Sequence, residues 1–325
     1  MKSSEMINLT KNHYRRVFQL FFFLFTVYAW VRLYLFVSHF DKGWPYVDRP
    51  VSIEAFLPIG ALVSLKNLIL NRFIDPVHPA ALVIFMAVIT SAVVFRRGFC
   101  GWVCPIGFIS EMLTLAGERL GGRTFLGTDY LKVLKYGLLI FFLALILPMS
   151  ADDAAMFLFS PYWAIADVKL LDFWLKPGNL TVIVTMILIF GTLLVKNLWC
   201  RFVCPYGALI GILSLASPAR IEKNGCTGCA KCDEACPAGI KISHKNQITT
   251  PDCIMCLECI SACKYGYLKL KFAGVSVKKV IYYPTAIAAI LFGFFAIAKL
   301  TGNWDSILRY EDYEKLLKVR DFISH

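Results

Sequence analysis

Long apolar runs constrain this chain more than any other feature, because about 20 mostly apolar residues of helix are enough to cross a bilayer. Apolar residues make up 58% of the 325 residues and charged residues 17%, a balance that excludes an ordinary soluble protein. Five runs are roughly long enough: Val17 to Phe40, Ala80 to Phe95, Leu134 to Met149, Leu180 to Val195 and Val280 to Ala298. We therefore predict a mainly α, polytopic membrane helix bundle with about five spans.

The basic residues predict how the bundle is oriented. Lys and Arg exceed Asp and Glu by 34 to 22, and they cluster beside the apolar runs, so we expect no nucleic-acid partner. With the N-terminus inside, segments 1–16, 96–135 and 196–279 hold 22 basic residues, and the outer segments hold 10. Positive residues favour the cytoplasmic side. We predict a multi-pass protein of a bacterial-type inner (cytoplasmic) membrane, with the N-terminus cytoplasmic and the C-terminus periplasmic.

A sequence motif occurs twice, 100 residues apart. Phe99 to Gly107 and Trp199 to Gly207 share a C-x3-C-P pattern, and each copy follows a span and precedes an apolar stretch too short to cross. Such duplication is common in membrane bundles. We predict that residues 1–220 form the bundle, with one half at about 17–120 and the other at about 131–216.

Eight of the twelve cysteines lie in a polar module at 221–272. Closely spaced runs of this kind bind three corners of one [4Fe–4S] cluster, while the fourth cysteine reaches the neighbouring cluster. Structural zinc sites instead use pairs separated by a longer loop. We predict two clusters, the first held by Cys226, Cys229, Cys232 and Cys263, and the second by Cys253, Cys256, Cys259 and Cys236. Gly228, Gly239 and Gly266 are expected to allow the necessary turns.

The cysteines of the repeated motif are less specific. Proline at a first helical position predicts that Cys104 and Cys204 are the N-caps of two interfacial helices. If the two halves pack about an axis along the membrane normal, Cys100, Cys104, Cys200 and Cys204 converge on a further cluster or metal. Alternatively, they are redox-active thiols, or they only shape two turns. Arg96 and Arg97 either anchor the inner interface or tune the charge of a bound cluster.

Two C-x3-C-P motifs, an outer loop reading Glu54-Ala55-Phe56-Leu57-Pro58-Ile59 and the eight-cysteine module together resemble the polyferredoxin membrane proteins that include NapH, MauN and the membrane half of NosR. This resemblance covers roughly residues 17 to 270. It implies a [4Fe–4S] membrane component of a quinol dehydrogenase or a redox maturation factor, with the cluster module in the cytoplasm. The segment 273–325 departs from NapH, because its fifth span and outer tail are more like CcoG-type assembly proteins.

A quinol site needs an apolar slot and groups that exchange protons. Glu54, Lys66 and His78 lie among apolar residues of the first outer loop and are the candidates; no other catalytic residue is predicted. The chain is thus expected to be the electron-transfer subunit of an oxidoreductase, linking the quinone pool to a periplasmic or cytoplasmic redox partner. The alternative is a maturation or regulatory factor that keeps a metal centre or partner enzyme reduced. The tail from Thr301 is expected to dock a periplasmic partner or to lie on the membrane.

Overall fold

The computed structural model describes residues 2–121, 129–277 and 281–323, with side chains from Tyr14 onward in the first helix. Val280, the expected start of the fifth span, and residues 324–325 of the tail lie outside these ranges. The chain divides into two compact units. Unit 1 comprises residues 1–24, 88–140 and 184–290, and unit 2 comprises residues 25–87, 141–183 and 291–325.

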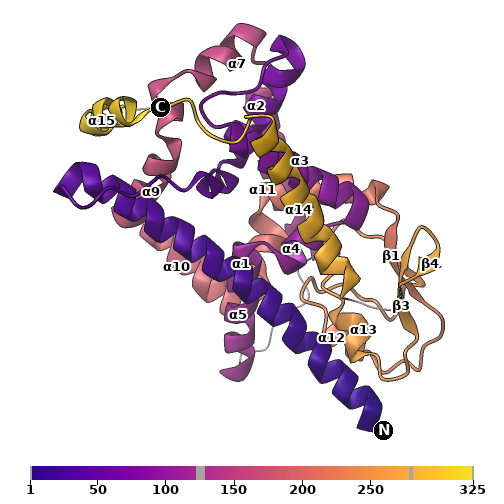
Figure 1. Ribbon diagram of the computed structural model, residues 1–325. Coiled ribbons are helices and arrows are strands. Elements are labelled where there is room, and N and C mark those ends of the chain that lie inside the picture. Colours follow the sequence, from indigo (N-terminus) through magenta and orange to yellow (C-terminus); the bar gives the residue numbers. More distant parts are fainter. Residues whose placement is uncertain (1, 122–128, 278–280, 324–325) are drawn as a thin grey trace. The chain divides into compact units, whose positions relative to one another are not determined.

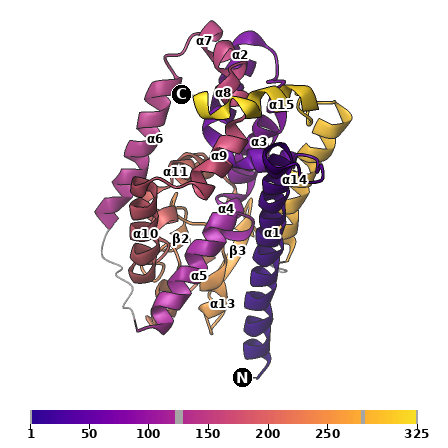
Figure 2. The ribbon, with the colours of Figure 1, turned by 90° about the vertical axis from the view of Figure 1, so that its left-hand side faces the viewer.

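The described chain is mainly helical (Figures 1 and 2). The five helices at the expected spans are α1 (Lys2–Lys42), α3 (Pro79–Phe95), α6 (Val133–Ile146), α10 (Asn179–Leu194) and α14 (Tyr282–Leu300). The helices between and after them are α2 (Pro58–Asn71), α4 (Gly98–Trp102), α5 (Pro105–Arg119), α7 (Ala151–Leu158), α8 (Pro161–Ala164), α9 (Ala166–Leu175), α11 (Pro205–Leu213), α12 (Lys231–Glu234), α13 (Glu258–Ala262) and α15 (Tyr310–Lys318). Each of the five expected span helices contributes residues to both units.

The helices that are long and apolar enough to cross a membrane are fewer than the five spans that the sequence predicts. Among the described residues, only α1 and α14 are long and apolar enough to cross a membrane alone. The count rises to four if two bent pairs each form one span: the α6 segment bends by 101° into α7, and α9 bends by 77° into α10. At 17 residues, α3 is a shorter apolar helix. The apolar runs therefore mark the positions of these helices correctly. At α6 and α10, however, the candidate span is a bent pair of helices and not one straight helix.

Unit 1 contains a four-stranded antiparallel sheet in the order β2-β1-β3-β4. Its strands are β1 (Ala219–Lys223), β2 (Gln247–Ile248), β3 (Leu268–Phe272) and β4 (Val275–Ser276). Ile221 pairs with Ile248 on one side and with Leu270 on the other, and all three are buried. The first and third strands therefore hold the beginning and end of the cysteine-rich segment beside each other, with β1 and β3 adjacent in Figure 1.

In unit 2, the C-terminal tail is part of the core. Tyr313 and Leu317 of α15 are 5% exposed and pack with Leu33, Phe36 and Ile165. The Arg320 guanidinium also reaches Asp41, at 3.0 Å. The apolar side of this amphipathic helix is therefore buried within the protein, so the expectation that it lies on the membrane or docks a partner is wrong for that face. Its near-helical apolar spacing is the same for an interfacial and an internal helix, which is why the sequence does not separate them.

Candidate functional site

The two cysteine runs of unit 1 adopt the same backbone conformation. Gly228 and Met255, which precede the second cysteine of each run, have φ of 75° and 49°. Ala230 and Leu257, which follow it, have φ of 53° and 65°. Alternating left-handed and right-handed residues point successive N–H groups into one concavity, as in many iron–sulfur sites. Gly228, Gly239 and Gly266 all have positive φ, as predicted.

One predicted ligand set lies around a single cavity of about 330 Å³. The cavity is lined by Cys236, Cys253, Cys256 and Cys259, together with apolar residues that include Ile221 and Ile248 of the sheet. The Ile240 N–H donates a hydrogen bond to Cys236 Sγ at 3.4 Å. Burial raises the pKa of the Cys253 thiol to about 11. An apolar pocket with four thiols and aligned N–H donors fits an iron–sulfur cluster, which holds the sulfurs as thiolates.

The other predicted ligand set is closer to solvent. Cys226 and Cys229 are exposed, whereas Cys232 and Cys263 are half-buried. The Gly228 N–H lies 3.4 Å from Cys226 Sγ, and a hydrogen bond from the Lys231 N–H lowers the pKa of the Cys229 thiol. Throughout the described ranges, no group of three His, Cys, Asp or Glu side chains is placed to hold a single metal ion.

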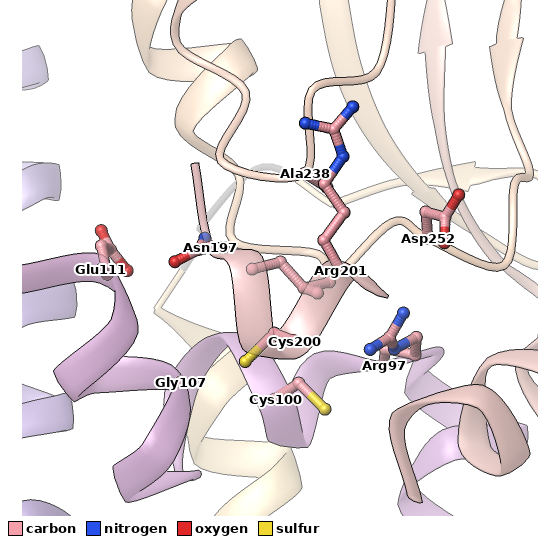
Figure 3. A pocket seen from close by; sticks show the side chains of 10 residues that line it. Arg97, Cys100, Gly107, Glu111, Asn197, Cys200, Arg201, Ala238 and Asp252 are labelled. Carbon is pink, nitrogen blue, oxygen red and sulfur yellow. The ribbon is translucent and has the colours of Figure 1, made fainter. Parts of the chain in front are cut away.

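The repeated motifs of unit 1 form two similar turns. Cys104 and Cys204 are the N-caps of α5 and α11, each followed by proline, as predicted. The thiols of Cys100, Cys104, Cys200 and Cys204 all lie within electrostatic range of one another. Figure 3 shows Cys100 and Cys200 beside each other, with the Arg97 guanidinium nearby, at a cavity of about 420 Å³. The structure thus brings the motif cysteines of the two halves together.

The first motif packs directly on the buried cysteine loop. The Trp102 Nε1–H donates to the Met255 carbonyl at 2.9 Å, and Trp102 is 2% exposed. A Cβ at Gly101 would lie 2.3 Å from the Ile254 carbonyl oxygen. Arg15 Nε donates to the Gly101 carbonyl at 3.1 Å from the other side. The motif cysteines and the second cluster site are therefore neighbours in one rigidly packed region.

This packing predicts that adding one methyl group at Gly101 destabilises the protein. Gly101→Ala should destabilise unit 1 by about 1–3 kcal/mol, because the new Cβ overlaps main-chain atoms that cannot rotate away. It should also lower the iron content of the purified protein. Gly137→Ala is the control, since nothing lies within 4 Å of a Cβ there. Thermal unfolding and iron analysis of both variants measure the effect; equal values for the two would contradict the close approach.

Arg96 and Arg97 are buried rather than placed at an exposed interface. They are 1% and 2% exposed. Arg96 donates to the Thr250 carbonyl at 2.9 Å and Arg97 to the Pro251 carbonyl at 3.1 Å. The Nε atom of each has no hydrogen-bond partner in the described structure. Buried guanidinium groups need nearby negative charge, which fits anionic groups bound by the adjacent thiolates. Of the two alternatives, this burial is more consistent with arginines that tune the charge of a bound cluster.

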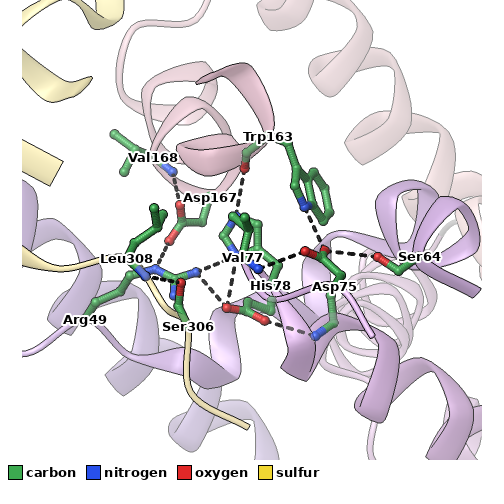
Figure 4. A network of polar contacts seen from close by, with 12 residues as sticks. Arg49, Ser64, Asp75, Val77, His78, Trp163, Asp167, Val168, Ser306 and Leu308 are labelled. Atoms are coloured by element: carbon green, nitrogen blue, oxygen red, sulfur yellow. Dashed lines mark hydrogen bonds and ion pairs between the residues drawn. The ribbon is translucent and has the colours of Figure 1, made fainter. Parts of the chain in front are cut away.

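Unit 2 contains a buried polar network, drawn in Figure 4. Arg49 joins two carboxylates, with Nε 2.6 Å from Asp167 and one terminal nitrogen 2.8 Å from Glu54. His78 Nδ1 lies 3.0 Å from Glu54. Glu54, His78 and Asp167 are at most 1% exposed. Two of the three quinol-site candidates thus touch each other in a fully buried place.

The ring of His78 has one fixed donor. Its Nε2 lies 2.7 Å from the Trp163 carbonyl oxygen, which can only accept, so Nε2 carries a hydrogen. Nδ1 faces both the Glu54 carboxylate and the Arg49 guanidinium, each at 3.0 Å. Arg49, His78 and Glu54 therefore meet at one buried point of the network.

Lys66, the third candidate, lies apart from this network. Its ammonium donates to the carbonyls of Ile146 and Leu147 at 2.8 and 2.7 Å, where it caps α6. The sequence does not single out Arg49, and it places Asp75 in the first outer loop without assigning it to the quinol site. Asp75 accepts hydrogen bonds from Ser64 and Trp163 at 3.1 and 2.8 Å. No local pattern marks either residue, because their partners lie up to 118 residues away along the chain.

Comparison with known families bears on both cysteine regions. A family model described as a 4Fe-4S binding domain matches residues 77–123 and 179–224, each of which contains one C-x3-C-P motif. A second model, a 4Fe-4S dicluster domain, matches residues 218–264. These matches support iron–sulfur binding by this chain. No solved structure is significantly similar to it.

Several curated proteins are similar over most of their length. The putative electron transport protein YccM of Escherichia coli is 32% identical, over 100% of this chain and 91% of that protein. The ferredoxin-type protein NapH of Haemophilus influenzae is 27% identical over 62% of this chain and 71% of its own. The methylamine utilization ferredoxin-type protein MauN of Methylorubrum extorquens is 27% identical, over 69% and 78%. The cysteine pattern and these relatives agree: the chain belongs to the NapH- and MauN-type family of ferredoxin-type, iron–sulfur electron-transport membrane proteins.

Proposed function

We propose that this protein carries electrons between the quinone pool and a redox partner through two [4Fe–4S] clusters. The observation that carries the proposal is the buried cavity lined by Cys236, Cys253, Cys256 and Cys259. Cys226, Cys229, Cys232 and Cys263 hold the first cluster. When bound, such clusters accept and release single electrons. The protein's own part is to fix the thiolates, to exclude water from the second site and to leave the first near solvent, where a partner can approach.

We propose the following membrane arrangement. The bundle of residues 1–220 has two similar halves, and residues 221–272 form the cluster module on the cytoplasmic side. Segment 273–325 supplies the last span and the outer tail. The excess of basic residues in segments 1–16, 96–135 and 196–279 supports this orientation in a bacterial-type inner membrane.

A third redox centre at Cys100, Cys104, Cys200 and Cys204 is part of the proposal. The four thiols lie within electrostatic range of one another, which supports this third centre. The match of a 4Fe-4S binding model to residues 77–123 and 179–224 also supports it. Iron and acid-labile sulfide analysis of anaerobically purified protein tests it. We expect more iron than two clusters contain, and Cys104→Ser should remove only the excess. Iron sufficient for only two clusters would exclude this third cluster.

Glu54 and His78 are the proposed proton-accepting groups for quinol. Oxidation of a quinol breaks two O–H bonds, releasing two electrons to the protein's redox centres and two protons. The shared position between Glu54 and His78 Nδ1 takes up one proton, and the other goes to water. Arg49 holds the Glu54 carboxylate in place by a 2.8 Å ion pair. Lys66 stays a separate candidate for contact with the quinol head group.

Reduction by quinol tests this assignment. Adding a reduced menaquinone analogue anaerobically should bleach the iron–sulfur absorbance of the purified protein. Glu54→Gln should slow this bleaching roughly 100-fold, because a positioned base typically contributes at least that factor. Bleaching by dithionite should be unchanged in Glu54→Gln, and Lys66→Gln should slow the quinol reaction less. Wild-type protein that no quinol reduces would refute the quinol linkage.

A second candidate function, redox maturation of a metal centre or partner enzyme, is favoured by the convergence of the four motif thiols. Neighbouring thiols can form and release a disulfide, which keeps a partner reduced without steady turnover. Deleting the gene should then leave the partner oxidised or without its metal, while the partner purified in its mature form stays active. An electron carrier would instead leave the partner intact but without its electron supply.

A further inference from the structure

Four buried arginines act electrostatically on the cysteines of the second cluster site. Arg96 and Arg97 both interact electrostatically with the Cys253 thiol. Arg15 interacts with Cys256, and Arg201 with Cys236. These four side chains are at most 3% exposed. Their charges are therefore poorly screened by water and act strongly on whatever the thiols hold.

Carboxylates balance only part of this positive charge. Arg15 is compensated by Glu111 and Glu258, at 2.6 and 2.9 Å. Among the described residues, the side chains of Arg96 and Arg97 donate hydrogen bonds to main-chain carbonyls. The nearest carboxylate along the chain from those carbonyls, Asp252, bonds Lys135 at 2.5 Å and Lys132 at 3.2 Å. Arg97 also faces Asp252 and the motif thiols electrostatically, whereas Arg96 acts mainly on Cys253.

The first cluster site has the opposite surroundings. Cys226 and Cys229 are exposed. The carboxylate of Asp233 lies 3.6 Å from Cys232 Sγ, and it adds negative charge next to the thiolates. The cations nearest in sequence, Lys231 and Lys264, have exposed side chains. Water and dissolved ions screen their effect.

We propose that Arg96 and Arg97 raise the reduction potential of the cluster held by Cys236, Cys253, Cys256 and Cys259 above that of the other cluster. Reduction adds one negative charge to this site. Burial alone opposes that charge, but two fixed, buried guanidinium groups in the same region stabilise it. The inference rests on the proposed cluster ligands. Its consequence is that an electron rests on the buried cluster, next to the motif cysteines, before it moves to the exposed one.

Redox titration of the full-length protein, followed by electron paramagnetic resonance, tests the inference. We expect two reduction waves from the two module clusters, which are assigned in a Cys104→Ser background so that the third centre does not contribute. Cys229→Ala, which removes the exposed cluster, should retain the wave of higher potential. Arg96→Gln and Arg97→Gln should each lower that wave, changing the ratio of reduced to oxidised cluster at fixed potential about tenfold, or about 59 mV for one electron. Arg96→Lys should retain most of the wild-type value.

Lys264→Gln is the matched control, because it removes one positive charge next to a ligand of the exposed cluster. We expect it to leave the higher wave in place. The inference is overturned if Cys229→Ala retains the lower wave, or if Arg96→Gln and Arg97→Gln bind full iron with unchanged potentials. Iron is measured in the same samples. Wild-type protein without iron would instead overturn the proposed function, so the two failures are distinguishable.

Discussion

Replacing Cys256 with alanine should remove about half of the iron bound by the cysteine-rich module. The Cys256 side chain faces the buried cavity together with three other thiols, and alanine offers no ligand. The reduced protein should change from the magnetic resonance spectrum of two interacting clusters to that of one. Iron analysis and spectroscopy of anaerobically purified protein measure both effects.

Cys229→Ala should have the same effect on the exposed cluster, leaving the buried one. Cys104→Ser is the control, since that residue belongs to the repeated motif and should leave both module clusters in place. Full iron and an unchanged spectrum in Cys256→Ala would refute the ligand assignment. A loss of all iron from Cys256→Ala, with normal iron in Cys229→Ala, would show that the two sites do not assemble independently.

Replacing Arg49 with methionine should destabilise the protein by about 3–5 kcal/mol, because it leaves two buried carboxylates without their cation. Arg49 forms ion pairs with both Glu54 and Asp167, at 2.8 and 2.6 Å. Thermal unfolding in detergent measures the loss. The triple change Arg49→Met, Glu54→Gln and Asp167→Asn should recover much of it, since it removes the opposing charges together.

An exposed ion pair of the same unit provides the comparison. Lys299 and Asp305 lie 2.7 Å apart, with about half of each side chain or more exposed. Asp305→Asn should therefore change the stability by at most about 1 kcal/mol. If Arg49→Met had no larger effect than Asp305→Asn, the network would not stabilise the unit.

The parts of the structure that the sequence predicts are those with a local pattern. Cysteine spacing predicts the two turns with left-handed residues, and proline after Cys104 and Cys204 predicts two helix starts. Apolar runs locate the long helices. They do not predict the angle between α6 and α7, because an apolar run gives the extent of a helix and not its direction relative to the next one. The burial of Arg96 and Arg97 also has no local signal, since it depends on carbonyls more than 150 residues later.

The exposure of Cys226 and Cys229 affects how the two clusters withstand dioxygen. Dioxygen reaches a solvent-facing cluster readily and oxidises its iron and thiolates, whereas close packing of the protein around a buried cluster slows its approach. Brief aeration should therefore damage the outer cofactor while the inner one, behind Ile221, Ile240 and Ile248, survives. A cell returning to anoxic conditions would then need to rebuild only one of the two.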